Sequence, residues 1–589
     1  MATTRQAFQI FLVLLVLPCI TATVTKLWVV YDTKNEKFQV QEQPQTDYVA
    51  VASLANTINQ TGWAKLDVTT YAGPKRKYND SIQAYAAGFV EGHLTRSLMT
   101  MHWANTGAWV CPEPLSKQCM QLKRFLKKNM DWMLQNIKVS SSSSPFWHHV
   151  RLFLEQSAGL QDGYAGMPGK LNLDIEIFGV FIWQLGGDFE TLLQVFPTPS
   201  SDQNIKAPDP WAAGIGHCSA LLRLLPDYSD LYVAQDTWSD FSSMLKVLKR
   251  YSFEMLKYPA DTSTPAPGNT ITFSSYPGVL FSGDDFYTIS SGLLTQETTI
   301  GYSNSSLNQY IKPTSVMEGI RTMVANRLAA SGREWAQIFS LSNSGTYNNE
   351  WMVVDYKLFE PGRKEPVMGL FTLLEQIPGT IIYEDMTQYL YKNMYYGSYN
   401  TPGTIVYDDL THILYKNMYF GSYNHAYFPE IFNKSGQPAL VAKYGDWFTY
   451  ERTPRALIFK RDAPKVKDLT AMIKLMRYNN FKHDPLSRCN CTPPYSGENA
   501  IAARCDLNPA NGTYPFGALG HRPHAATDMK VTTFELFKSQ SFQAQSGPPF
   551  DDVPAFQWST SSFKDNSHVG HPDLWKFPVI TFNGSNPMQ

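Results

Sequence analysis

The sequence predicts an α+β fold in which helices and strands form layers. Before residue 197, long segments with apolar residues three or four positions apart predict helices. After residue 218, short apolar segments bounded by turn residues predict strands. Helices and strands that concentrate in different parts of a chain are typical of layered α+β folds. A Pro-, Ser- and Asp-rich stretch, 197–210, separates the two parts and reads as an exposed, cleavable connection.

The first part opens with a predicted secretory signal peptide, residues 1–23. Arg5 precedes a 13-residue apolar run, 8–20, which ends at small residues. This run is shorter than the roughly 20 residues that a membrane-spanning helix needs, and no later segment is long and apolar enough to span. Candidate glycosylation sites support the secretory route: Asn59, Asn79, Asn304, Asn433, Asn490, Asn511 and Asn583.

The rest of the first part is expected to begin with strand segments and continue mainly with helices. Residues 27–30 predict a strand, and 50–59 predict a strand or the start of a helix. Apolar spacing predicts helices over 82–101, 119–137, 147–156 and 173–185. The Ser run 140–144, which ends at Pro145, predicts a loop.

The second part is expected to be richer in strands. Predicted strands are 219–225, 231–234, 270–274, 286–290 and 351–356. Amphipathic helices are predicted over 238–256 and 315–330.

Charge and motifs exclude several classes of function. The chain has 50 Lys and Arg against 51 Asp and Glu, with no long charged run, so no nucleic-acid partner is expected. It has neither a Gly-x-Ser-x-Gly motif nor a Gly-rich phosphate loop. Three His pairs resemble metal ligands: His148 with His149, His521 with His524, and His568 with His571. The last two lie in Pro-containing loops without a helical frame of ligands. Neither a metal nor another cofactor is expected.

Cys218 is the candidate nucleophile. It follows the connection directly and precedes an apolar strand segment. A cut before this residue would place its thiol beside its own α-amine, which can take the thiol proton. The alternative is a buried and inert cysteine, because free Cys is often fully buried.

Motifs from one end of the chain to the other identify a family resemblance. They are Gly216-His217-Cys218-Ser219-Ala220-Leu221, Asp236-Thr237-Trp238, Phe273-Ser274-Ser275-Tyr276-Pro277-Gly278, Tyr347-Asn348-Asn349-Glu350-Trp351, Val354-Asp355-Tyr356-Lys357, Tyr444-Gly445-Asp446-Trp447-Phe448, Pro454-Arg455-Ala456, Asp506-Leu507-Asn508-Pro509-Ala510-Asn511-Gly512 and Phe556-Gln557-Trp558-Ser559-Thr560. With them, the chain resembles the phospholipase B-like family of N-terminal-nucleophile hydrolases over residues 26–579.

The resemblance implies a four-layer αββα sandwich with Cys218 opening a central strand. It also implies a precursor that cuts itself between His217 and Cys218. Residues 24–217, with the connection at 197–217, and 218–589 would then form one composite domain in a lysosomal or secreted protein. The implied activity is removal of fatty acyl chains from phospholipids. An amidase acting on lipid amides or small peptide-like substrates is one alternative, and a non-catalytic lysosomal lipid-binding protein is another.

The catalytic partners are expected around the new α-amine. An α-amine titrates near pH 7.7–8, so about 0.2% would be unprotonated at pH 5 unless the site lowers its pKa. Arg455 is the candidate cation for this effect, and Asn349 and Asn424 are candidate donors to an oxyanion. Asp236 follows Cys218 by 18 residues, which fits a hairpin that brings it to the amine.

The substrate pocket should include residues beside Asp236. Trp238 is expected to form its wall, together with Thr237 and Gln235. Family members have His at the position of Gln235, so a role that needs a titrating imidazole is not expected there.

A duplication departs from the family pattern. Residues 378–400 recur as 402–424 with a 24-residue period. Two copies are too few for a solenoid. The family's continuation follows only the second copy, so Asn424 is taken as the family-equivalent residue and Asn400 as its duplicate.

Disulfides are expected in an oxidising compartment. Cys111 and Cys119 close a short loop and are the first expected pair. The family places a C-x-x-C pair at Cys489 and Cys491, where the spacing here is shorter; Cys491 with Cys505 is the alternative. Removal of the signal peptide would remove Cys19 and leave six cysteines. If Cys218 stays free, five remain for pairing and one is left over.

Overall fold

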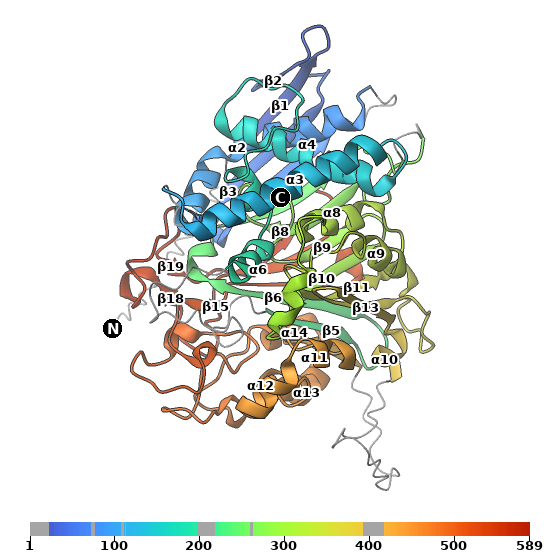
Figure 1. The fold of residues 1–589 in the computed structure, drawn as a ribbon. Coiled ribbons are helices and arrows are strands. Elements are labelled where there is room, and N and C mark those ends of the chain that lie inside the picture. The colour runs from blue at the N-terminus through green and yellow to red at the C-terminus, as the bar shows by residue number, and fades with distance from the viewer. Residues whose placement is uncertain are drawn as a thin grey trace, which may run out of the picture.

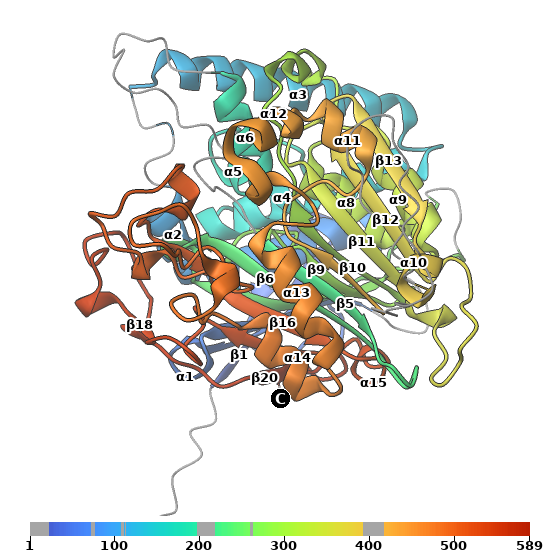
Figure 2. The same cartoon turned by 90° about the horizontal axis from the view of Figure 1, so that it is seen from below.

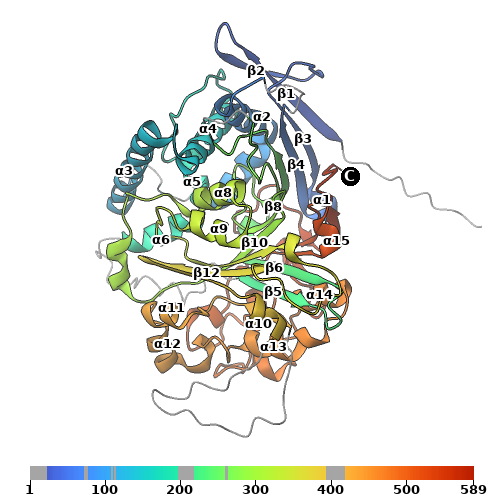
Figure 3. The ribbon, with the colours of Figure 1, turned by 90° about the vertical axis from the view of Figure 1, so that its right-hand side faces the viewer.

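Two large β-sheets lie face to face between layers of helices. The computed structural model describes residues 23–71, 77–107, 111, 114–196, 218–258, 263–392 and 418–588. Within these ranges the layers run helix, sheet, sheet, helix (Figure 1 and Figure 3). The predicted mixed α and β architecture is confirmed. Of the predicted signal peptide only Thr23 is described, and the connection 197–217 lies outside the described residues.

The first sheet joins strands from both sides of the connection. Among the described residues its order is β13-β12-β11-β10-β9-β8-β7-β4-β3-β1-β2. β4 and β7 pair in parallel, and the other neighbours are antiparallel. In chain order these strands are β1 (Val24–Asp32), β2 (Lys37–Gln41), β3 (Ala50–Thr57), β4 (Trp63–Thr70), β7 (Lys246–Ser252), β8 (Thr270–Ser275), β9 (Phe286–Ile289), β10 (Leu293–Thr299), β11 (Asn349–Asp355), β12 (Phe371–Ile377) and β13 (Thr380–Asp385).

The second sheet comes from the second part of the chain. Its order among the described residues is β14-β5-β6-β16-β17-β20, with β15 also paired to β6. These strands are β5 (Cys218–Leu224), β6 (Leu231–Asp240), β14 (Tyr419–Ser422), β15 (His524–Ala526), β16 (Asp528–Thr532), β17 (Phe542–Ser546) and β20 (Ile580–Phe582). A separate short ribbon pairs β18 (Phe556–Gln557) with β19 (Leu574–Trp575).

Helices cover the outer faces. On the first sheet lie α2 (Asp80–Thr106), α3 (Lys117–Ser140), α4 (Pro145–Ala165), α5 (Val180–Trp183), α6 (Gly187–Val195), α8 (Glu318–Leu328) and α9 (Gly332–Phe339). Figure 2 shows α13 (Pro454–Asp462) and α14 (Leu469–Met476) over β5 and β6. The other helices are α1 (Ile58–Thr61), α10 (Thr387–Lys392), α11 (Pro429–Lys434), α12 (Gln437–Tyr444) and α15 (Phe534–Phe537). No helix in the described ranges is both long and apolar enough to cross a membrane.

Alternation along the strands builds the core between the sheets. Ala220, Leu222 and Val233 of the second sheet pack with Leu294 and Met352 of the first. The next residue on each strand points the opposite way, so Leu221 and Ala234 pack instead against α13 and α14. This alternation also fixes which side chains near Cys218 face the other sheet.

Close packing of α2 and α4 depends on glycine. A Cβ on Gly88 would lie 1.9 Å from Gln156 O, and one on Gly159 would lie 2.1 Å from Tyr85 O. Because backbone would have to move, any side chain at these positions would separate the two helices. Both helices begin at a capping side chain. Asn79 caps α2, with its Oδ1 accepting from Ile82 N at 2.9 Å, and Ser144 caps α4 directly before Pro145.

Three predicted elements need correction. Residues 238–256 are not a helix; they contain the end of β6, a 3-10 turn at Phe241–Ser243 and β7. Both faces of these strands are covered, so polar alternation is lost and the spacing imitates a helix. In 173–185 only α5 is helical, and α8 within 315–330 is buried on all sides instead of amphipathic. The ambiguous segment 50–59 forms β3 followed by α1.

The duplicated segment contributes to both sheets. Its first copy supplies β13 and α10, and its second copy supplies β14. Residues 393–417, including Asn400, lie outside the described residues. The described residues on both sides of this gap contact the β5–β6 hairpin. Tyr391 stacks on Tyr228 with ring centroids 5.9 Å apart, and Leu224 N donates to Met418 O at 2.9 Å.

This geometry predicts that residues 393–416 are dispensable for the fold. Their deletion joins Lys392 to Asn417 and restores a single copy of the repeat. Because shortening a connection changes closure entropy only slightly, we expect the melting temperature to change by less than about 3 °C. Thermal unfolding of the secreted protein measures this.

Deletion of 393–424 is the control, since it also removes β14 and its pairing with β5. That variant should be strongly destabilised. Equal destabilisation by both deletions would contradict the interpretation of 393–416 as a removable copy.

Candidate active site

Cys218 is the first residue of β5 and the first described residue after the connection. β5 pairs with β6 as the predicted hairpin, with Cys218 opposite Thr237 and Ser219 opposite Asp236. All of β5 is buried, and Cys218 is 5% exposed. The thiol is therefore held in a fixed position at the point where the chain enters a central strand.

A cavity of about 280 Å³ reaches Cys218. Its lining combines the end of α2 and the α5–α6 region with the strands around Thr237 and Tyr276. Both parts of the chain therefore build it. The described lining has no Lys or Arg and is rich in aromatic rings: Trp103, Trp183, Phe189, Trp238, Tyr276, Phe281 and Tyr347. Such a lining suits an apolar group more than a strongly charged one.

Asn424 holds the backbone nitrogen of Cys218. Cys218 N donates to Asn424 Oδ1 at 3.1 Å, and Asn424 Nδ2 donates to Thr299 O at 2.7 Å. Asn424 has φ +71°, a left-handed conformation that Asn adopts more readily than most residues. Because Thr299 ends β10, Asn424 links the two sheets at Cys218. Its second N–H has no acceptor among the described residues.

Arg455 places a positive charge against the same residue. Its Nη1 donates to Cys218 O at 2.6 Å, and its guanidinium carbon lies 4.3 Å from the Trp238 ring centroid. Burial lowers the pKa of Arg455 to about 10, so the side chain remains charged at physiological pH. The stacking on Trp238 and the bond to the main chain fix this charge in place.

The thiol itself is in an environment that keeps it protonated. Burial raises the pKa of Cys218 well above its usual value, and the nearby Glu297 carboxylate raises it further. An attacking thiol here therefore needs a proton acceptor. With the Asn349 amide oriented to satisfy both of its ends, its Nδ2 donates to Glu297 Oε2 at 2.8 Å. Asn349 thus bonds to Glu297, the acidic side chain that opposes ionisation of the thiol.

Buried carboxyl groups cluster around Glu297. Burial raises the pKa of Asp285 to about 7 and that of Asp188 to about 6. Burial and mutual repulsion raise the pKa values of Glu297 and Glu318 well above their usual range. Tyr347 OH donates to Asp285 Oδ2 at 2.6 Å. The cluster is therefore accommodated best in its protonated, neutral form.

A buried ionic network beside Thr237 was not predicted from the sequence. Lys530 Nζ donates to Thr237 Oγ1 and to Asp528 Oδ1, both at 2.6 Å. Lys246 Nζ donates to Asp528 Oδ2 at 2.6 Å and to Asp284 Oδ1 at 3.2 Å. Lysines inside strand-like apolar segments were a usable signal, because unpaired Lys is almost never fully buried. Their partners, however, lie far away in sequence.

The other candidate residues of β6 lie on opposite faces of the strand, because successive side chains alternate. Gln235 and Thr237 share the face of Cys218, and Thr237 Oγ1 donates to Gln235 Oε1 at 3.2 Å. Asp236 lies on the opposite face with Ser219, and neither carboxyl oxygen has a hydrogen-bond partner among the described residues. Asp236 therefore does not contact the Cys218 nitrogen, which Asn424 holds instead.

The paired histidines have different partners among the described residues. His148 Nε2 lies 2.8 Å from Asp80 Oδ2, while His149 Nε2 lies 2.9 Å from Leu256 O. The two rings of 568 and 571 lie 6.4 Å apart, with the first stacked on Trp558. His521 bonds to Asn508 O and Ser562 Oγ, so it is separate from His524.

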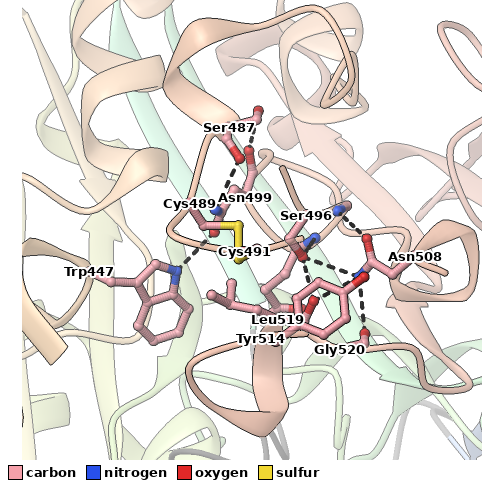
Figure 4. The surroundings of a disulfide bond; sticks show 12 residues. Trp447, Ser487, Cys489, Cys491, Ser496, Asn499, Asn508, Tyr514, Leu519 and Gly520 are labelled. Atoms are coloured by element: carbon pink, nitrogen blue, oxygen red, sulfur yellow. Dashed lines mark hydrogen bonds between the residues drawn. A yellow bond between two sulfur atoms is a disulfide. The ribbon is translucent and has the colours of Figure 1, made fainter. Parts of the chain in front are cut away.

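Two disulfides are present in the described residues. Cys111 bonds to Cys119, and Cys489 bonds to Cys491. Figure 4 shows the second bond near Trp447 and the polar network around Asn508. The alternative pair of Cys491 with Cys505 is not formed, and Cys505 is free and buried.

The candidate glycosylation sites differ in exposure. Exposed sites are Asn59, Asn79, Asn433, Asn490 and Asn511, and partly exposed sites are Asn304 and Asn583. Asn304 Nδ2, the atom that would carry a glycan, donates to Lys434 O at 3.1 Å.

His217, on the expected scissile bond, lies outside the described residues.

Comparisons with known proteins cover nearly the whole chain. The sequence profile of the family described as Phospholipase B matches residues 50–402 and 401–582. The two matches meet within the duplicated segment. The chain is 46% identical to the protein named "Putative phospholipase B-like 2" of Homo sapiens over 91% of this chain and 85% of that protein. It is 45% identical to the protein of the same name of Mus musculus over 93% of this chain and 87% of that protein. Phospholipase B-like protein B of Dictyostelium discoideum is 32% identical over 92% and 87%.

The carboxyl cluster predicts greater stability in acid. The pKa of Asp285 is about 7 in the folded protein, against an ordinary value of about 3.9. Folding therefore favours the protonated group, and this stabilisation is complete below about pH 4 and is lost as pH rises through 7. We expect the free energy of unfolding in urea to fall by about 2 kcal/mol or more from pH 5 to pH 8.

Asp285→Asn should make this pH dependence smaller, because its amide stays neutral and can still accept from Tyr347. Asp131→Asn is the matched control, since Asp131 is an exposed carboxylate on α3. A wild-type protein that is equally stable at both pH values would contradict the prediction.

Proposed function

The chain belongs to the phospholipase B family, and on this premise we propose that it is a hydrolase that releases fatty acyl chains from phospholipids. Cys218 is the proposed nucleophile, exposed as an N-terminus by self-cleavage after His217. The observation that carries the proposal is the bond from Cys218 N to Asn424 Oδ1 at the cavity, because it positions the future α-amine beside the thiol. The layered fold would then be of the N-terminal-nucleophile type.

Processing uses the thiol first against its own chain. Cys218 Sγ attacks the carbonyl carbon of His217, the bond from that carbon to Cys218 N breaks, and the acyl group moves to sulfur. The thiol proton goes to the leaving nitrogen. Water then hydrolyses the thioester, leaving a carboxylate on His217 and a free amine and thiol on Cys218.

Turnover repeats this chemistry on a substrate ester. The α-amine takes the thiol proton as sulfur attacks the ester carbonyl, and passes it to the departing alcohol. Water resolves the acyl-thioester to a fatty acid and regenerates the thiol. The second N–H of Asn424 is the proposed donor to the oxyanion. The charge of Arg455 disfavours protonation of the amine and so supports a base that works in acid.

The cavity supports an acyl substrate. Its aromatic lining can surround a hydrocarbon chain, and its lack of Lys and Arg in the described lining offers a phosphate no ion pair. The headgroup would therefore remain nearer the opening. The predicted signal peptide and the exposed sequons support a secreted or lysosomal protein, and the acid preference of the carboxyl cluster agrees with the latter.

Cys218→Ala should abolish both reactions. The wild type should separate under denaturing conditions into two pieces, one beginning at Cys218, while the variant stays a single chain. Fatty acid release from phosphatidylcholine should be faster near pH 5 than at neutral pH and absent in the variant. Cys218→Ser keeps a hydroxyl that can attack, so we expect it to retain partial activity. Gel electrophoresis with N-terminal sequencing and a fatty-acid assay measure these results.

A variant Cys218→Ala that is cut at the same bond without another protein would contradict self-cleavage. Faster release from an N-acyl amide than from the matching ester would favour an amidase. No turnover of either substrate by fully cut protein between pH 4 and pH 8 would favour a lipid-binding protein.

Asn424→Gly should impair processing and turnover much more than Asn400→Gly. Glycine keeps the left-handed backbone of residue 424 but removes the bonds to Cys218 N and Thr299 O. Loss of an oxyanion donor typically lowers rate by about 100-fold or more. Single-turnover rates, measured with melting temperatures, separate this effect from unfolding; equal small effects would remove Asn424 from the site.

A further inference from the structure

A second cluster of reactive side chains lies next to Trp238, which packs with Cys505. Glu498, Cys505 and His524 each direct one potential ligand atom toward the others, and these atoms lie within 4.8 Å of one another. Their residues are 2%, 0% and 6% exposed. Cys505 forms no disulfide. The Cys-His-carboxylate set is distinct from the cavity at Cys218, whose lining includes none of the three.

The contacts leave a coordinating atom available. Cys505 Sγ donates to Glu498 Oε2 at 2.8 Å, and Arg522 Nη2 donates to the same oxygen at 2.8 Å. The other carboxylate oxygen, Glu498 Oε1, is buried and has no hydrogen-bond partner among the described residues. A buried acceptor without a partner is costly, and a bound cation would satisfy it.

The backbone around these residues is held firmly. His524 lies on β15, opposite Asp240 of β6. The segment that carries Glu498 is fixed by Asn508, whose Oδ1 accepts from Gly497 N at 2.8 Å and whose Nδ2 donates to Ser496 Oγ at 3.1 Å (Figure 4). Preformed ligands on restrained segments reduce the entropy lost on metal binding.

We propose that Glu498, Cys505 and His524 bind one zinc ion or a divalent ion of similar preference. Thiolate, imidazole and carboxylate are all established zinc ligands, and solvent or the second carboxylate oxygen can complete a tetrahedron. Tetrahedral bond lengths place ligand atoms roughly 3.3–3.6 Å apart, so small side-chain rotations suffice. On binding, Cys505 loses its thiol proton to solvent. Arg522 offsets the second negative charge of the thiolate and carboxylate pair.

Cobalt binding to the full secreted protein tests this site. After chelator treatment and dialysis, Co²⁺ should bind at one equivalent and give the near-ultraviolet absorption of a cobalt–thiolate bond. Cys218→Ala should keep this absorption, whereas Cys505→Ser should lose it and bind Co²⁺ at least about 10-fold more weakly. His521→Gln is the matched control, because His521 bonds elsewhere and should not affect the signal.

Thermal unfolding keeps the test decisive if a variant folds poorly. Zn²⁺ should raise the melting temperature of the wild type and of His521→Gln, but not that of Cys505→Ser or His524→Ala. Folded wild-type protein that takes up no Co²⁺ and shows no Zn²⁺-dependent shift would overturn the proposal. Retention of the cobalt–thiolate absorption by Cys505→Ser would overturn it as well.

Discussion

The hydrogen bonds of Asn424 are the constraint on which the candidate site depends. One bond fixes the nitrogen of Cys218 at the start of β5 in the second sheet, and the other reaches Thr299 in the first sheet. The Asn424 side chain that makes both bonds is fully buried, where hydrogen bonds are stronger and their loss is more damaging. The relative position of the two sheets therefore sets the position of the thiol. Arg455 completes the constraint from the helical layer by binding Cys218 O.

This arrangement explains how a cut chain could remain one molecule. β4 and β7 come from opposite sides of the connection, yet they pair along their length in one sheet. α2 of the first part and Trp238 of the second part both line the cavity. Breaking the bond before Cys218 would leave these contacts intact. The same packing can thus serve precursor and mature protein, and the cut itself adds an amine at Cys218 and a carboxylate at His217.

Sequence was sufficient for the local features of this site. The spacing between Cys218 and Asp236 predicted the β5–β6 hairpin, and the register confirms it. The spacing could not predict that Asp236 lies on the face opposite Cys218, because a shift of one residue in register moves every side chain of a strand to the other face. Residues 238–256 were wrongly assigned because strands covered on both faces lose their alternating pattern.

Contacts between residues far apart in the chain could not be predicted from the sequence, for a different reason. Lys530 and Thr237 are nearly 300 residues apart, and nothing in either segment specifies the other. The same holds for Glu297, whose carboxylate acts on Cys218 through the packing of the two sheets. Family motifs selected Asn424, but only the structure places its oxygen on the Cys218 nitrogen. Motifs identify residues that matter, whereas their contacts follow from tertiary packing.

Direct capture of the acyl-enzyme tests the central claim that Cys218 is an N-terminal nucleophile. Processed protein can be mixed with a phospholipid, quenched in acid, digested and examined by mass spectrometry. The account predicts a peptide that begins at Cys218, has a free α-amine and carries the substrate acyl group as a hydroxylamine-sensitive thioester. An acyl group on another residue, or turnover by protein in which Cys218 is still joined to His217, would contradict it.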